Sequence, residues 1–157
     1  MNNKTYTDDV IERMKYQIQN EPDAYLTPNF RAKEFACKMC LKAGVYYNVI
    51  KPELVLKLQD VRNILGVPII ITSGCRCKKH NQEIGGASKS FHLSGEAVDV
   101  YSPRLAITNI YLVAEKNGFN GIGTYPEEGF VHLDIGNRYS RWTQQTIDGI
   151  YRYVYII

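Results

Sequence analysis

Two of the three histidines stand close to aspartates at spacings that suit metal binding. The stretch SKSFHLSGEAVDV (88–100) places His92 seven residues before Asp99, and His132 stands two residues before Asp134. Neutral imidazole nitrogens and carboxylate oxygens are ligands of zinc, and catalytic zinc sites combine two histidines and one carboxylate with an open fourth position. These residue types therefore predict a metal centre.

Strand periodicity predicts that these polar side chains share one face of a sheet. Successive side chains of a strand point to opposite faces. In the segments EAVDVY and FVHLDI, the face expected to meet the core carries Val98, Val100, Val131, Leu133 and Ile135. Asp99, His132 and Asp134 then fall on the other, open face, and the loop before the first segment delivers His92 to the same end.

The remaining sequence pattern predicts an α+β fold. Helices are expected over 7–19, 52–65 and 104–117, and strands over 67–73, 96–101, 121–125, 129–136 and 150–157. The segment VPIIITS (67–73) is expected to be a buried strand, because it contains a short apolar run. The region 74–91 is rich in Gly, Ser, Lys and Asn, which predicts a long loop with at most one helical turn. This order predicts a small, largely antiparallel sheet with helices against one face.

The length of the chain favours one domain, and its charge gives no indication of a nucleic acid or membrane partner. The chain has 157 residues, and its net charge of +3 is spread without a run of like charges. This pattern gives no argument for nucleic acid or membrane binding. The first residues lack an apolar signal-peptide core and no stretch approaches a membrane span, so we expect cytoplasmic synthesis without a signal peptide. We also expect a monomer.

Two further groups of residues allow more than one interpretation. The cysteine pairs Cys37-x-x-Cys40 and Cys75-x-Cys77 fit a zinc site made of all four, two disulfides, or buried free thiols. His80 has no motif support and is expected to be a loop residue. The basic and aromatic stretch with Arg138, Tyr139, Arg141 and Trp142 suggests packing or contact with a glycan, rather than stacking on single-stranded nucleic acid.

One segment carries a motif that resembles a known family. SFHLSGEAVD contains the pattern S-x-H-x-x-G-x-A-x-D, formed by Ser90, His92, Gly95, Ala97 and Asp99. This pattern resembles the zinc-site motif of peptidase family M15, which includes D-alanyl-D-alanine carboxypeptidases and murein endopeptidases.

Two flanking blocks extend this resemblance. PIIITSGCRCKKHNQEIGGA (68–87) is similar to the strand and loop before the family motif, and GIGTYPEEGFVHLDIGNRYSRW (121–142) is similar to its closing hairpin. The likeness covers about 28–142 and is closest to the single-domain, phage- and prophage-type branch. It implies one peptidase domain over 1–157, with an N-terminal helical segment (1–24) and a C-terminal extension (143–157).

The resemblance implies a fold, a cofactor and roles for particular residues. The fold is that of the hedgehog and D,D-peptidase group, and the cofactor is Zn²⁺. The family's zinc ligands fall on His92, Asp99 and His132. Arg76 matches an arginine that contacts substrate or stabilises the tetrahedral intermediate, and Ser90 matches a residue that lines the substrate pocket.

The chain departs from the family at the general base. Many members carry an acidic residue or a histidine three positions before the last ligand, and Gly129 occupies that position here. We expect Asp134 to act as the base, because it lies on the same strand face as His132, with Glu128 on the hairpin as the second choice. Asp134 alternatively fixes the His132 ring as a hydrogen-bond partner.

These implications predict a zinc-dependent peptidase that cleaves peptidoglycan stem or cross-link peptides. The activity is that of a D-Ala-D-Ala carboxypeptidase or a murein endopeptidase, and the enzyme resembles an endolysin that acts on the cell wall after release or in a virion. Which bond is cut stays open. The alternative is a non-catalytic, zinc-containing binding module of the same fold, which the absence of a side chain at Gly129 favours.

Overall fold

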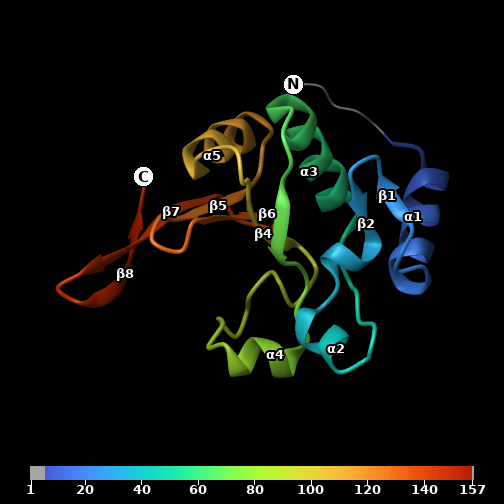
Figure 1. The fold of residues 1–157 in the computed structure, drawn as a ribbon, viewed down its shortest axis with the longest axis horizontal. Helices are drawn as coiled ribbons and strands as arrows, with labels where there is room; N and C mark the ends of the chain where they lie inside the picture. Colours follow the sequence, from blue (N-terminus) through green and yellow to red (C-terminus); the bar gives the residue numbers. More distant parts are fainter. Residues whose placement is uncertain (1–5, 157) are drawn as a thin grey trace.

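A computed structural model describes residues 6–156 (Figure 1). Residues 1–5 of the expected N-terminal segment, and residue 157 of the expected last strand, lie outside the described residues. The helices are α1 (Asp8–Asn20), the 3₁₀ helix η1 (Ala32–Phe35), α2 (Lys38–Lys42), α3 (Pro52–Leu65), α4 (Lys78–Glu83) and α5 (Ile107–Lys116). The strands are β1 (Tyr25–Thr27), β2 (Phe30–Arg31), β3 (Ile70–Ser73), β4 (Ala97–Tyr101), β5 (Gly121–Tyr125), β6 (Phe130–Asp134), β7 (Ser140–Ile147) and β8 (Ile150–Tyr155).

The main sheet has six strands in the order β3-β4-β6-β5-β7-β8, and β1 and β2 form a separate pair. Neighbouring strands of the main sheet run antiparallel, except that β5 and β7 are parallel. The sheet is therefore largely antiparallel and the fold is a mixture of helices and strands, as the sequence pattern predicts.

Helix α3 shows how local signals fix an element beside the sheet. Pro52 occupies the first turn, where a missing N–H costs nothing, and Gly66 ends the helix in the left-handed region at φ 68°. The residues of its apolar side, among them Leu54, Leu58 and Val61, are fully buried. Burial of such a side chain contributes about 1.5–3 kcal/mol each. The observed bounds are those predicted.

The core lies between the helices α3 and α5 and one face of the sheet (Figure 1). The predicted core residues of β4 and β6 are fully buried there: Val98, Val100, Val131 and Leu133. Ile135 packs against the same core while partly exposed. The parity argument therefore assigned the core face of both strands correctly, which leaves Asp99 and His132 on the opposite face.

The strand predicted over 67–73 is shorter and less buried than expected. β3 begins at Ile70 and lies at the edge of the sheet, paired only with β4. Ile69 and Ile71 are buried, whereas Ile70 is 40% exposed. The expectation of a buried strand therefore holds for the face that meets the core and fails for the other face, where Ile70 is exposed.

Other differences concern α4, α5 and the C-terminal end. Part of the predicted loop 74–91 forms α4, and the helix predicted over 104–117 spans only Ile107–Lys116. The expected last strand is present as β8, and it pairs with β7, which the sequence pattern did not predict. Within residues 6–156, no helix is long and apolar enough to cross a bilayer.

Candidate active site

One residue from each strand of the main sheet falls on a single line across it. The pairing registers place in this line Ser73, Asp99, His132, Gly123, Trp142 and Tyr155. Because Gly123 has no side chain, the Trp142 indole lies over it, where a β-carbon would overlap the ring. The indole reaches His132, with ring centroids 5.1 Å apart. The sheet thus supplies a carboxylate, an imidazole and an aromatic wall at one level.

This face of the sheet is covered at the level of the line. His92 is 2% exposed, Asp99 is 6% exposed and Asp134 is fully buried. The face expected to be open is therefore the floor of a cavity, whose wall includes residues of the segment between α4 and β4, among them Ser90 and Phe91. Low exposure strengthens the electrostatic interactions of these groups, since little water screens them.

His92 is held by the backbone around it. Its Nδ1 donates to the carbonyl oxygen of Gly74 at 2.7 Å, and its own carbonyl accepts from the Arg76 N–H at 2.9 Å. Gly95 adopts φ +73°, and a β-carbon there would overlap the Val49 carbonyl, so only glycine lets the loop pass. Because the Gly74 carbonyl fixes a proton on Nδ1, a neutral His92 ring would present the lone pair of Nε2 to a metal ion.

His92, Asp99 and His132 converge on one point. Oδ1 of Asp99 lies 3.2 Å from Nε2 of His92 and 3.1 Å from Nδ1 of His132. The three ligand atoms all lie within 4.8 Å of one another. Nitrogen and oxygen ligands of a tetrahedral zinc ion, at 2.0–2.2 Å from the metal, are about 3.3 Å apart. The spacing therefore fits zinc, and these residues would hold it.

The charged groups of the site favour a positive charge between them. Burial alone would lower the pKa of His132, but hydrogen bonds to Asp134 and Asp99 outweigh it and raise that pKa to about 9. Burial would raise the pKa of Asp99, yet the charges and hydrogen bonds of His92 and His132 hold it well below its usual range. A proton occupies this place in the metal-free protein, and a metal ion would replace it.

We expect the metal-free protein to lose stability as the pH rises from 6.5 to about 9. The folded-state pKa of His132 is raised above its ordinary value of 6.5. Its stabilising contribution is therefore complete below pH 6.5 and is lost as the pH rises through 9. Thermal unfolding in a chelator on either side of this window measures the loss. The variant His132→Gln should lose clearly less thermal stability over this pH window than the wild type. An equal loss in both proteins would contradict the assignment of the effect to His132.

Asp134 lies on the far side of the His132 ring from Asp99. Its Oδ2 accepts from Nε2 of His132 at 2.8 Å, and its Oδ1 accepts from the Gly136 N–H at 3.0 Å. Arg138 adds an ion pair at 3.4 Å. With no exposed surface and with the ring between it and Asp99, Asp134 is poorly placed to take a proton from an attacking water. The geometry favours the second role considered for it, orientation of the His132 ring.

Arg76 is fixed beside the candidate ligands. Its Nη2 contacts Oδ2 of Asp99 at 3.2 Å, and its Nε donates to the Ser73 hydroxyl at 3.1 Å. A third contact joins Nη1 to Oδ1 of Asn81 at 3.5 Å. Arg76 therefore holds the oxygen of Asp99 that the histidines do not use, while part of its guanidinium still lines the cavity beside them.

The remaining candidate carboxylate stands on the turn between β5 and β6. Gly129 closes this turn at φ +79°, and Glu128 is exposed beside it. The neighbouring Glu127 is used differently, because its carboxylate accepts from the N–H and the hydroxyl of Thr146. Tyr125 and Phe130, which flank the turn, both line the cavity described next, so Glu128 stands at its edge.

A cavity of about 680 Å³ opens over the candidate ligands. Its lining comprises Arg76, Ile84, Gly85, Gly86, Ala87, Lys89, Ser90, Phe91, His92, Asp99, Tyr125, Phe130, His132, Arg138, Trp142, Tyr153 and Tyr155. Ser90 therefore lies where the resemblance implies a pocket residue, and its hydroxyl accepts from the His92 N–H at 3.3 Å. A pocket of this size that combines aromatic walls with converging polar groups is typical of ligand sites.

Sequence reasoning missed the aromatic wall contributed by the last strand. Tyr153 and Tyr155 of β8 both line the cavity. Their alternate positions in IYRYVY are the signal that places them on one strand face.

The two arginines of the basic and aromatic stretch 138–142 have different environments, one at the cavity and one in the packed interior. Arg138 lies over the rings of Phe91 and Trp142, at 4.8 Å and 5.6 Å from their centroids, and so belongs to the cavity wall. Arg141 is buried and donates to the carbonyl oxygen of Phe119, so it is a packing residue.

With this geometry established, comparison with known proteins identifies the family. The model of the Peptidase M15 family matches residues 28–134, about two thirds of the chain. The chain belongs to this family. The match contains all three candidate ligands, the whole block 68–87 and the part of the second block up to Asp134.

Among curated proteins, the chain is similar to peptidoglycan endopeptidases. It is 35% identical over 94 residues to the peptidoglycan L,D-endopeptidase MepK of Escherichia coli, which covers 55% of this chain and 52% of the relative. It is 30% identical over 91 residues to the probable peptidoglycan L,D-endopeptidase MepK of Haemophilus influenzae, covering 58% of this chain and 47% of the relative. The chain therefore spans about half the length of the curated relatives it matches.

Proposed function

We propose that this protein is a zinc-dependent peptidase that cleaves peptidoglycan peptides. The observation that carries the proposal is the convergence of His92, Asp99 and His132 beneath a cavity of about 680 Å³, in a chain of the M15 family. When bound there, zinc supplies a water of lowered pKa and polarises the scissile carbonyl.

The residues around the ligands prepare the site for this chemistry. Arg76 holds one oxygen of Asp99 and keeps the other directed at the two imidazoles. Asp134 holds the proton of His132 Nε2, so that Nδ1 faces Asp99 and the ligand position. We assign to Arg76 the further task of binding the developing oxyanion or a substrate carboxylate, because its guanidinium also lines the cavity.

The role of Asp134 leads to a specific prediction. Asp134→Asn is expected to weaken zinc binding and lower activity about 10–100-fold, because the amide no longer fixes the His132 ring as a carboxylate does. Zinc affinity measured by competition with a chelator, alongside turnover at saturating zinc, separates the two effects. Full zinc affinity with activity lost would instead support Asp134 as the general base.

We propose that Glu128 takes the proton from the attacking water. Among the residues 6–156 that line the cavity, Asp99 is the only carboxylate, and it is used by both histidines and Arg76. Gly129 offers no side chain and Asp134 lies behind the His132 ring. Glu128 is exposed on the turn whose flanking residues line the cavity. A movement of this turn toward the cavity on substrate binding would have to bring its carboxylate to the site.

The names of the relatives favour one bond type. Both matched proteins are named L,D-endopeptidases, and we propose that this chain also cleaves a bond between an L- and a D-residue of the peptidoglycan peptides. Arg76, Lys89 and Arg138 place cationic groups at a cavity whose wall also includes several aromatic rings. Such a wall suits an extended peptide that carries free carboxylates.

Digestion of purified peptidoglycan, followed by mass analysis of the released fragments, tests the function. We expect zinc-dependent release of peptides cut at an L,D bond, and cleavage of a synthetic cross-linked peptide but not of its epimer at the scissile position. Cleavage only of terminal D-Ala-D-Ala would assign a carboxypeptidase. The absence of turnover with zinc fully bound would contradict the proposal.

The second candidate function is a binding module that keeps the metal without catalysis. The observation that favours it is Gly129 at the position where many family members carry the base. Binding of peptidoglycan fragments without turnover would support it. The phage-type branch, and action on the cell wall after release or in a virion, remain proposals beside either function.

A further inference from the structure

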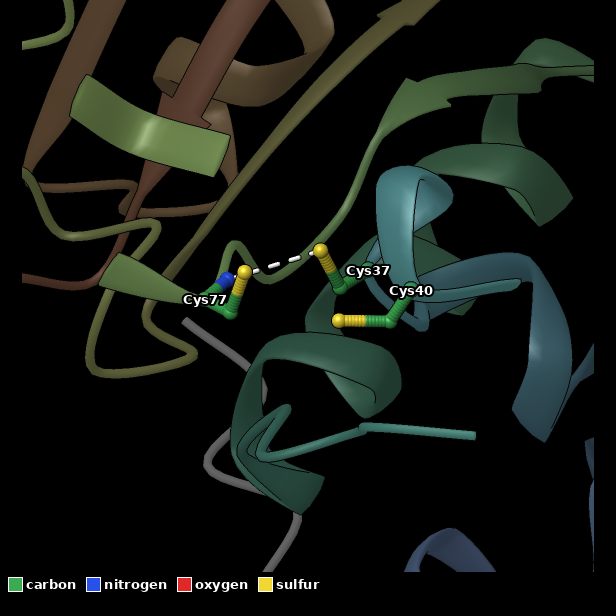
Figure 2. A group of neighbouring side chains, drawn as sticks. All are labelled: Cys37, Cys40 and Cys77. Carbon is green, nitrogen blue, oxygen red and sulfur yellow. Dashed lines mark hydrogen bonds between the residues drawn. The ribbon is translucent and has the colours of Figure 1, made fainter. Parts of the chain in front are cut away.

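A second cluster of metal-binding side chains lies away from the candidate active site. Cys37 precedes α2, Cys40 lies within it, and Cys77 caps α4. Figure 2 shows these three side chains converging from two separate segments of the chain. Their sulfur atoms lie within 4.8 Å of one another, and Cys37 is buried.

His80 of α4 lies beside this cluster, in contact with Cys37. Its Nδ1 lies 3.4 Å from Sγ of Cys37. It stands three residues after Cys77 on α4, just as Cys40 stands three residues after Cys37. The two spacings, C-x-x-C and C-x-x-H, are those of structural zinc sites with three cysteines and one histidine.

The dimensions of the cluster fit one tetrahedral ion. With zinc–sulfur distances of about 2.3 Å and zinc–nitrogen distances of about 2.0–2.1 Å, neighbouring ligand atoms are roughly 3.6–3.8 Å apart. The observed contact between Cys37 and His80, and the upper bound of 4.8 Å between the sulfurs, agree with this size. All four cysteines of the chain are free thiols in this structure.

The backbone around the cluster favours thiolates. The Cys77 N–H donates to Sγ of Cys37 at 3.5 Å, and the His80 N–H donates to Sγ of Cys77 at 3.4 Å. Such donors stabilise negative sulfur. Three thiolates this close repel one another unless a cation lies between them.

Cys75 does not belong to the cluster. Its thiol is 1% exposed and donates to the Tyr47 carbonyl at 3.6 Å, while its sulfur accepts from the Val49 N–H at 3.5 Å. Burial raises the pKa of this thiol to about 11. Of the three interpretations left open for the cysteines, a site made of all four does not fit, because Cys75 is not among the sulfur atoms that lie within reach of one ion. Cys75 is the buried free thiol that the third interpretation described.

We propose that Cys37, Cys40, Cys77 and His80 bind a structural zinc ion, distinct from the centre at His92, Asp99 and His132. The protein fills all four positions of this site, so none is open to substrate, as in structural zinc sites. The ion would join α2 to the start of α4. It would thereby link two segments that are far apart in the sequence, and such a link stabilises the fold by restricting the chain between them. It would also fix the residue next to Arg76, which holds Asp99.

Cobalt substitution of the full chain tests this site independently of activity. Thiolate ligands give bound Co²⁺ an intense charge-transfer absorption in the near ultraviolet, and a centre made only of histidine and carboxylate ligands gives none. We expect this band in the wild type and in Cys75→Ser, and its loss in Cys40→Ser with one metal ion fewer per chain. His80→Ala should weaken metal binding and alter the band without removing it.

The result separates this proposal from the proposed peptidase function. Asp99→Ala should keep the thiolate band, because none of its neighbours in the active site is a cysteine. If Cys40→Ser fails to fold, titration of the zinc-loaded wild type with a mercurial thiol reagent should still release a thiolate-bound equivalent of zinc. Absence of both the band and this release, or a disulfide among the three cysteines found by mass analysis of unreduced protein, would overturn the proposal.

Discussion

Asp99→Ala is expected to abolish peptidase activity and to lower zinc retention at the active site. Asp99 is the only carboxylate among the three converging groups, and its Oδ1 faces both His92 and His132. Without it, two imidazoles remain, and neither offsets the charge of the ion. Turnover on purified peptidoglycan and elemental analysis of zinc after dialysis are the measurements.

The structure also predicts a cost in stability for this variant. Asp99 is 6% exposed and pairs with Arg76, so its removal leaves a guanidinium without its partner in a poorly hydrated place. Breaking such a buried pair costs about 3–5 kcal/mol. Asp99→Asn keeps the shape and a hydrogen-bonding oxygen for Arg76, and is expected to be inactive while more stable than Asp99→Ala. Thermal unfolding of both variants makes this comparison.

Asp9→Ala is the matched control, because Asp9 is an exposed carboxylate in the first turn of α1. It should retain the activity and the zinc of the wild type. Turnover at the wild-type rate by zinc-loaded Asp99→Ala would remove Asp99 from the ligand set and with it the active site proposed here.

The placement of Asp99 and His132 was predictable because strand parity is a local rule. Side chains in a strand alternate strictly, so the apolar residues of β4 and β6 identify the face of every other residue. The register adds what parity cannot: Asp99 and His132 are direct neighbours across the two strands. This register between β4 and β6 is set by the packing of the whole sheet, so the sequence of either strand alone does not specify it.

The role of Asp134 was not predictable for a related reason. Parity correctly puts Asp134 on the face of His132, but a shared face does not specify which side of an imidazole a carboxylate meets. The rotation of the ring is set by Asp99 at Nδ1, which leaves Nε2 to Asp134. Orientation of a side chain is a tertiary property, and sequence spacing carries no information about it.

The contribution of Trp142 to the cavity wall and that of His80 to the cysteine cluster were missed for different reasons. β7 has the polar sequence SRWTQQTI, whose exposed end shows no apolar alternation, so no strand was expected to carry Trp142 to the cavity. The C-x-x-H spacing of Cys77 and His80 was visible in the sequence. It was obscured because Cys75 stands closer to Cys77 and suggested a pair of cysteines instead.

Glu128→Gln is expected to retain zinc and to lower turnover about 10²–10⁴-fold, the usual cost of removing a general base. The amide keeps the size of the side chain but accepts no proton at neutral pH. Loss of rate with unchanged zinc content, measured on the same peptidoglycan substrate, distinguishes a base from a ligand or a structural residue. Glu128 is exposed on the β5–β6 turn, so the substitution should leave thermal stability unchanged.

Glu127→Gln provides the matched control, because Glu127 is the adjacent residue of the same turn and its carboxylate is bound to Thr146 of β7. It should change the position of the turn slightly and turnover far less than Glu128→Gln does. An equal loss in both variants would show that the turn matters for shape rather than for proton transfer. An active Glu128→Gln combined with an inactive, zinc-loaded Asp134→Asn would transfer the base to Asp134. That result would require the His132 ring to rotate on substrate binding, because in this structure the ring lies between Asp134 and Asp99.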